Sequence, residues 1–234
     1  MSTLNPPKKI SKKHELREDK VVTFYARAWQ YFDQNRTLVY GILAGIVLVV
    51  VAVVGYVFYQ SRQSERANEL LGQIVGLYEQ GSYQESLDGT GDRVGLLEIS
   101  DEYGSTDAGN LAHFYAADAL FQLGEYDRAL EHFDEFDKSE DFIGASAIAG
   151  QAAVYENKGE YSRAGDHYRR AALHFENELN SPQYLLDAGR SYELAGDFAE
   201  AQEVYEMIRD DYPESNLATN IEVYIARAAA RQKS

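Results

Sequence analysis

The 234-residue chain contains no cysteine, which excludes disulfide bonds and thiol nucleophiles. Motifs of several common enzyme sites are also missing. There is no Gly-x-x-x-x-Gly-Lys-Ser/Thr loop to hold phosphates, no Gly-x-Ser-x-Gly elbow for a serine nucleophile, and no His-Glu-x-x-His zinc motif. We therefore expect a protein that is not an enzyme and that uses no cofactor.

Histidine is scarce, and its spacing is not typical of metal ligands. The five histidines are His14, His113, His132, His167 and His174. His132 and His167 occupy the same place in a repeated pattern, so a shared, partly exposed helical position is expected there. The sequence thus predicts no metal site.

Lysine is rare after residue 37, where only Lys138, Lys158 and Lys233 remain. Residues 1–37 hold 8 Lys and Arg against 4 Asp and Glu, whereas the rest of the chain holds 14 against 34. A surface this acidic repels nucleic acid, so no nucleic-acid partner is expected. Two interpretations stay open for the acidic part: a solvated surface suited to high salt, or a face for an electropositive partner.

Charge is absent from residues 38–59, which read LVYGILAGIVLVVVAVVGYVFY. A helix of this length rises roughly 33 Å, enough to cross a bilayer. The run is too long and its leader too extended for a cleaved secretory signal, and no small-residue cleavage site follows it. We expect an uncleaved single-pass anchor in the inner (plasma) membrane, with a cytoplasmic N-terminus and a periplasmic or otherwise extracytoplasmic C-terminal part, because basic flanks stay inside.

Two glycines in this run, Gly41 and Gly45, lie one helical turn apart. Such a spacing lets two membrane helices cross closely, so both residues are candidates for contact with another membrane subunit or for a homodimer. Glycine is also frequent in membrane spans without any such role, and that alternative stays open.

A glycine, an acidic residue and an aromatic residue recur in succession after the span, and each time an alanine stands three positions after the aromatic residue. The three copies are GEYDRALEHF at 124–133, GEYSRAGDHY at 159–168 and GDFAEAQEVY at 196–205. A period in the mid-thirties indicates stacked two-helix units with glycine at each turn. We expect the two helices of each unit to pack closely at the small residues Ala129, Ala164 and Ala201. The aromatic residues one helical turn later are expected to fill the space that remains between the helices; they are Phe133, Tyr168 and Tyr205.

The array is expected to have atypical ends. A weaker copy at 67–86 keeps Gly81 and breaks at DGTGD (88–92), which lacks the carboxylate pattern of a calcium loop and predicts a plain turn. Its second helix is expected at 93–103. The last segment, 216–234, has an apolar stripe at helical spacing and predicts a capping helix.

These residues resemble the tetratricopeptide repeat over about 108–215. The resemblance implies an all-α fold, a solenoid of tetratricopeptide-repeat helical hairpins, and the apolar run at 38–59 predicts a single transmembrane helix before it. The expected order is a basic cytoplasmic tail with an aromatic juxtamembrane segment (1–37), the transmembrane helix (38–59), a degenerate first repeat with an insertion (60–107), three repeats (108–215) and a capping helix (216–234).

The resemblance also implies a binding groove for proteins, lined by the first helix of each unit. The matching positions in this chain are the candidates for partner contact: Phe114, Asp118, Phe121, Gln122, Ala149, Glu156, Asn157, Leu186, Arg190 and Glu193. The Lys and Asn clamp that grips a C-terminal carboxylate is missing here, which disfavours the acidic terminal peptide of a cytosolic chaperone. An alternative for each position is ordinary solvation or packing between repeats.

The whole arrangement is similar to the ancillary SecYEG translocon subunit family. This resemblance implies protein partners: Sec translocon subunits, translocating clients or envelope chaperones. The alternative is a scaffold or coordinator for cell division or outer-envelope assembly, as in periplasmic coordinator proteins that share the repeat.

Overall fold

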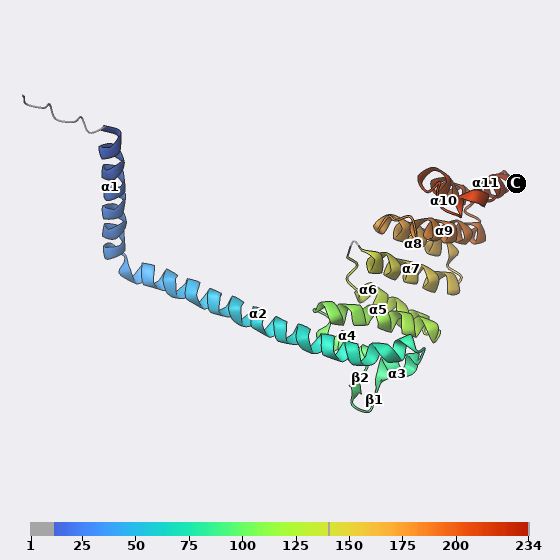
Figure 1. Ribbon diagram of the computed structural model, residues 1–234, viewed down its shortest axis with the longest axis horizontal. Coiled ribbons are helices and arrows are strands. Elements are labelled where there is room, and N and C mark those ends of the chain that lie inside the picture. Colours follow the sequence, from blue (N-terminus) through green and yellow to red (C-terminus); the bar gives the residue numbers. More distant parts are fainter. Residues whose placement is uncertain (1–11, 140, 234) are drawn as a thin grey trace, which may run out of the picture. The chain divides into compact units, whose positions relative to one another are not determined.

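The computed structural model describes residues 12–139 and 141–233, with side chains from residue 23 onward. The chain divides between Tyr59 and Gln60 into two compact units, each considered separately below. The N-terminal unit contains α1 (Lys12–Gln34) and the first part of α2 (Arg36–Glu79). The second unit is a helical array that begins with the last part of α2 (Figure 1).

An aromatic ladder joins α1 to the start of α2. The ring centroids of Tyr25 and Trp29 are 6.4 Å apart, those of Trp29 and Phe32 are 5.8 Å apart, and those of Phe32 and Tyr40 are 5.7 Å apart. The spacing of three and four residues within α1 puts its three rings on one helical face. Between the helices, the side chain of Asn35 donates a hydrogen bond to the Tyr31 carbonyl, a local bond that competes with helix continuation.

The apolar part of α2 is exposed along its length. From Tyr40 to Tyr59 every large apolar side chain exposes more than half of its surface. Among the described residues, α2 is the one helix that is long and apolar enough to cross a membrane, with a mean hydropathy of 2.8 in its most apolar stretch. Length and composition therefore agree with the expected span at 38–59.

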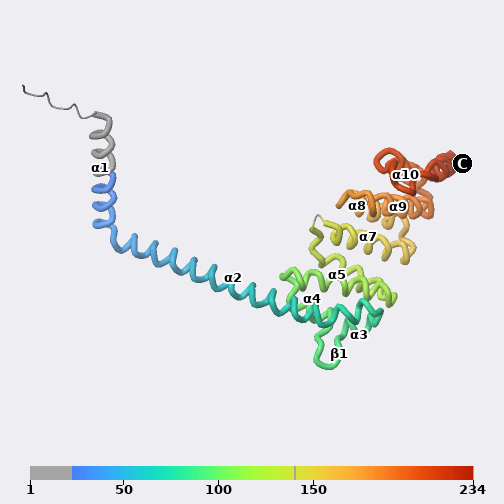
Figure 2. Tube along the Cα trace, viewed as in Figure 1, coloured from blue at the N-terminus to red at the C-terminus, as the bar shows by residue number. Residues whose placement is uncertain are grey.

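The array consists of helical hairpins that follow one another along the chain (Figures 1 and 2). The last part of α2 packs with the short helices α3 (Tyr83–Asp88) and α4 (Leu96–Tyr103). Three regular hairpins and a closing helix follow: α5 (Asp107–Gln122) with α6 (Tyr126–Glu135), α7 (Phe142–Asn157) with α8 (Tyr161–His174), α9 (Ser181–Ala195) with α10 (Phe198–Asp211), then the 3-10 turn η1 (Ala218–Asn220) and α11 (Ile221–Gln232). The predicted all-α hairpin solenoid is confirmed.

Local sequence signals begin the first helices of the hairpins. The Thr106 hydroxyl accepts a hydrogen bond from the Gly109 amide, and an Asp141 carboxylate oxygen accepts one from the Gly144 amide. Both are N-cap bonds that satisfy an amide left free by the first helical turn. In α9, Pro182 lies in the first turn, where its missing amide hydrogen costs no helical bond.

Glycine ends the first helix of each hairpin, as the repeat pattern predicts. Gly124, Gly159 and Gly196 have φ values of 79°, 77° and 91°, in the left-handed region that side chains other than glycine rarely adopt. After each glycine, the next amide donates back to a carbonyl of the preceding helical turn, for example from Glu160 to Tyr155 at 2.9 Å. This is the Schellman arrangement, and Gly81 at the end of α2 has it too.

The predicted joints inside the hairpins are also confirmed. Ala129, Ala164 and Ala201 are fully buried, and the aromatic residues four positions later in each unit, Phe133, Tyr168 and Tyr205, are buried with them. A small residue at the closest approach of two helices lets the following ring fill the remaining space. Neighbouring hairpins share buried residues in two clusters, one from α2 to α7 and one from α7 to α11.

The insertion in the first unit differs from its prediction. Its second helix does not begin at residue 93. Instead, β1 (Gly89–Thr90) pairs antiparallel with β2 (Arg93–Val94), and α4 begins at Leu96. The expected turn at 88–92 is therefore the tip of a small hairpin. Its backbones approach so closely that an added Cβ at Gly95 would lie 2.1 Å from the Leu87 carbonyl oxygen.

The closing helix is shorter than predicted. The expected segment starts at residue 216, but α11 begins at Ile221, after the turn η1. Ile221, Ile225 and Ala228 are buried and belong to the same core as α10. The apolar stripe therefore covers the last hairpin as the pattern predicts.

Candidate functional site

The groove candidates on α5 are partly buried against their own hairpin. The ring of Phe114 has its centroid 5.8 Å from that of Phe136 and 6.2 Å from that of Phe133. The ring of Phe121 lies 5.7 Å from Tyr126 at the start of α6. Both aromatic candidates thus contribute to packing and keep only part of their surface for another molecule.

The acidic candidate on α5 ties this helix to α2. Asp118 accepts a hydrogen bond of 2.7 Å from the hydroxyl of Tyr78. Burial, and next the bond to this carboxylate, raise the pKa of Tyr78 above its ordinary value, so the hydroxyl remains a donor. Asp118 therefore occupies a contact between neighbouring units.

The candidates on α7 accept hydrogen bonds from tyrosines of both adjacent helices. Glu156 receives a bond of 3.1 Å from the Tyr168 hydroxyl on α8, and the side-chain oxygen of Asn157 receives one of 3.1 Å from the Tyr126 hydroxyl on α6. Burial and the Glu156 carboxylate raise the pKa of Tyr168. The second bond crosses from one hairpin to the next, and the Asn157 side chain remains exposed.

On α9, the closing helix contacts both charged candidates, Glu193 and Arg190. Two guanidinium N–H groups of Arg227 on α11 donate to the two carboxylate oxygens of Glu193, at 2.9 and 2.6 Å. Only 12% of the Glu193 side chain is exposed. Arg190 is exposed and lies 3.4 Å from a carboxylate oxygen of Asp187. Arg227 of the closing helix thus binds Glu193, and Tyr224 of the same helix is a hydrogen-bond partner of the exposed Arg190.

One repeated position stays exposed in all three hairpins. Gln122, Asn157 and Leu194 stand at equivalent places, 35 and 37 residues apart, near the ends of α5, α7 and α9. Leu194 exposes 60% of its surface. It was not among the sequence-based candidates, although the glycine register would have identified it. Ala149 is partly buried and Leu186 is buried in the core.

The two glycines of the apolar stretch are not required by the packing of this chain. An added Cβ at Gly41 or at Gly45 would have no atom within 4 Å. Contact of this face with a second membrane helix stays a prediction.

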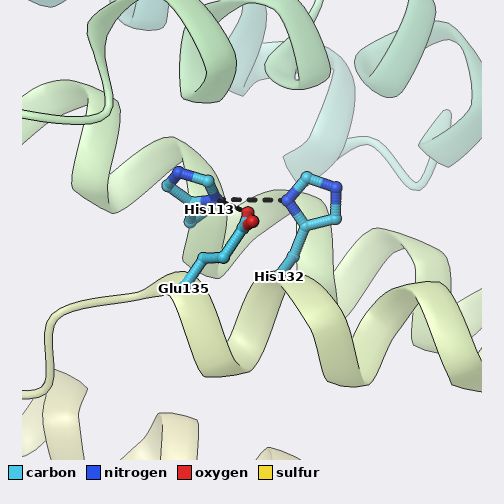
Figure 3. A group of neighbouring side chains, drawn as sticks. All are labelled: His113, His132 and Glu135. Atoms are coloured by element: carbon cyan, nitrogen blue, oxygen red, sulfur yellow. Dashed lines mark hydrogen bonds and ion pairs between the residues drawn. The ribbon is translucent and has the colours of Figure 1, made fainter.

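A cluster that the sequence did not predict lies between α5 and α6 (Figure 3). His113 Nδ1 is 3.2 Å from His132 Nδ1 and 3.3 Å from Glu135 Oε2. Both imidazoles are buried, whereas the carboxylate is half-exposed. The expectation that the histidines form no ligand cluster, and that His132 is partly exposed, is therefore wrong.

Burial governs the protonation of this pair. Desolvation is the main cause that lowers the pKa of both His113 and His132, and the neighbouring ring lowers that of His132 further. The carboxylates of Glu135 and Asp101 act in the opposite direction. The His132–Glu135 spacing of three residues on one helix was the available signal, but the helix crossing that brings in His113 is not local.

The sequence comparisons agree with the fold. The family model of the tetratricopeptide repeat matches residues 111–139 and 183–215. These segments cover most of the hairpins α5–α6 and α9–α10. Curated proteins provide no match to the chain. The helical array is thus similar to tetratricopeptide repeats in sequence over two segments and in fold over all three hairpins, and such repeats indicate a protein–protein interaction module.

Proposed function

We propose that the protein is a membrane-anchored interaction module that works beside the Sec translocon and captures translocating clients or envelope chaperones. It has no catalytic role in this proposal. The observation that carries it is the composition of α2, because one helix contains both an exposed apolar stretch of membrane-spanning length and the first helix of the repeat array.

The proposed orientation places the N-terminus in the cytoplasm and the array outside the inner membrane. The excess of Lys and Arg before the span supports it. The exposed rings of Tyr25, Trp29 and Tyr40 support a position of this flank near the membrane surface, where aromatic side chains are enriched. Proteolysis of the array in spheroplasts tests the orientation, and complete protection of the array with an intact inner membrane would contradict it.

The proposed contact surface is the row formed by Gln122, Asn157 and Leu194. These side chains are exposed, recur with the repeat period and lie on the first helices of the hairpins. The half-buried rings of Phe114 and Phe121 add apolar surface on α5. A periodic row of this kind suits an extended segment of a partner protein, because each hairpin offers one contact at a regular interval.

Site-specific photo-crosslinking in cells tests both the surface and the partner. A photoreactive residue is placed at Gln122 or Asn157, and in a matched control at Glu131, which is exposed on α6. We expect crosslinks to Sec subunits or exported proteins at the first two positions and few at the control. Crosslinks to division or outer-membrane assembly proteins would favour the scaffold alternative instead.

The contribution of charge is separated by salt. If apolar contacts hold the partner, co-purification survives about 1 M salt, at which the Debye length falls to about 3 Å. It is then lost on Leu194→Glu, a substitution at an exposed position that leaves the core unchanged. Loss in salt with indifference to Leu194→Glu would place the contact on the acidic outer surface.

A further inference from the structure

We propose that His113, His132 and Glu135 form a binding site for a divalent transition-metal ion, with Zn²⁺ as the ion that fits best. The site lies between α5 and α6, at the end of the hairpin away from the Gly124 turn (Figure 3). It does not depend on the proposed function of the array.

Two of the three distances between the donor atoms match those of a zinc centre. Zinc binds imidazole nitrogen at about 2.0–2.1 Å in a tetrahedron, which places neighbouring donor atoms about 3.3 Å apart. The separations from His113 Nδ1 are 3.2 Å to His132 Nδ1 and 3.3 Å to Glu135 Oε2. All three donor atoms lie within 4.8 Å of one another, and the half-exposed Glu135 side chain has room to turn toward a bound ion.

The hydrogen bonding of His113 leaves a lone pair directed at the cluster. The Ser100 carbonyl of α4 accepts a hydrogen bond from this ring. Nε2 is the nitrogen on that side, since an added Cβ at Gly104 would lie 2.6 Å from the Ser100 oxygen and 3.1 Å from His113 Nε2. A neutral ring that donates through Nε2 has an unprotonated Nδ1.

In this tautomer the Nδ1 lone pair of His113 can accept either a proton from His132 Nδ1 or a cation. The Nδ1 lone pair of His113 faces the Glu135 carboxylate, and both atoms are acceptors. A bound metal ion would accept both lone pairs, and the Ser100 carbonyl would then be the outer partner that orients a ligating histidine.

The surroundings favour positive charge at this point. The carboxylates of Asp101 and Glu131 act electrostatically on the histidine pair in addition to Glu135. Two imidazoles and one carboxylate are also a ligand set that zinc uses when a fourth position is left for water. The exposed side of Glu135 gives that position access to solvent.

The next hairpin provides an internal comparison. The residues 35 positions later are Ile148, His167 and Arg170, so one histidine is kept while the other two donors are replaced. His167 Nδ1 lies 2.9 Å from the Arg163 carbonyl oxygen of its own helix instead of another imidazole. The repeat position alone therefore does not make a ligand, and the proposed site is confined to α5–α6 among the three hairpins.

Calorimetric titration of Zn²⁺ into the full chain tests the proposal. The protein is purified in detergent with a tag that contains no histidine and is freed of metal with a chelator. We expect one site per chain for the unchanged protein. Glu135→Gln and His132→Asn should each weaken binding at least about tenfold, and His167→Asn should leave it unchanged.

Thermal unfolding with and without Zn²⁺ gives a second readout, because a ligand that binds only the folded state raises the melting temperature. The rise is expected for the unchanged chain and for His167→Asn, and its loss for Glu135→Gln, whose half-exposed side chain can change without disturbing the core. Absence of Zn²⁺ binding, or equal binding by the unchanged chain and Glu135→Gln, would overturn the proposal.

Discussion

Hairpins α5–α6 and α7–α8 are built on the same plan but differ in what lies between their helices. Each has a left-handed glycine at the turn and a fully buried alanine five residues later. Between the helices, however, the first hairpin has two facing imidazoles, and the second has one histidine, whose ring contacts Tyr155. The residues that define a repeat therefore leave other interhelical positions free to acquire a separate chemistry.

The two hairpins also differ in how their aromatic residues are used. Phe133 lies so close to α7 that an added Cβ at Gly150 would be 2.3 Å from its ring. Tyr168, at the equivalent position, directs its hydroxyl to Glu156. Phe133 thus joins two hairpins by packing alone, whereas Tyr168 adds a polar bond within its own hairpin.

The largest effect is expected from removal of the ring that joins the hairpins. Phe133→Ala should lower the free energy of unfolding by about 3–5 kcal/mol, because it leaves a cavity against α7. Urea denaturation in detergent, followed by circular dichroism, measures this. Phe142→Ala, at a half-exposed position, is the matched control and should cost under about 0.5 kcal/mol. Equal costs for both variants would contradict the packing described for Phe133.

The next effect is expected where the two hairpins are alike. Ala164→Leu should destabilise by about 1–3 kcal/mol, since the added atoms overpack a fully buried joint. Ala129→Leu should cost a similar amount, as both alanines hold the same position. The same denaturation assay applies, with the exposed Ala199→Leu as control. An unchanged midpoint for Ala164→Leu would refute the repeat register.

A smaller effect is expected at the turns. Gly124→Ala and Gly159→Ala should each cost about 1 kcal/mol, because alanine is strained at the positive φ of these positions. Gly72→Ala is the opposite case, since Gly72 lies inside α2 with no atom within 4 Å of an added Cβ. That substitution should stabilise by about 0.5–1 kcal/mol. Melting temperatures that shift in the same direction for Gly72 and Gly159 would contradict the turn assignment.

The smallest effect concerns the pH dependence of the second hairpin. Desolvation is the main cause that lowers the pKa of His167 in the folded chain, with Arg170 and Arg163 acting in the same direction, while the bond to the Arg163 carbonyl and the Asp166 carboxylate oppose it. The ring also contacts Tyr155 of α7. As pH falls below about 6.5, the unfolded chain binds a proton more readily than the folded chain, so stability decreases.

Replacement of His167 by Gln should therefore reduce the stability lost between pH 8 and pH 5.5, with the unfolding midpoint measured in the presence of a chelator. At pH 8 the stabilities of the two proteins should differ only by the effect of the substitution itself, which does not depend on titration. A larger acid sensitivity in His167→Gln than in the unchanged chain would contradict the direction given for this pKa.

The sequence alone determined the features that depend on neighbouring residues. The turns at Gly124, Gly159 and Gly196 follow from one residue type and its period, because positive φ is a local requirement. The buried alanines follow from the same register. The apolar stretch of α2 follows from composition, which needs no knowledge of what lies beside it.

Only the tertiary structure decided the features that depend on how helices cross. His113 and His132 are 19 residues apart on different helices, and their contact depends on the packing of α5 against α6. The groove candidates behave similarly: Glu193 is held by Arg227 of the closing helix, whereas Asn157 is exposed. The position in the repeat defines where a side chain is attached to its helix. The neighbouring helix determines whether that side chain is buried, hydrogen-bonded or free to contact a partner.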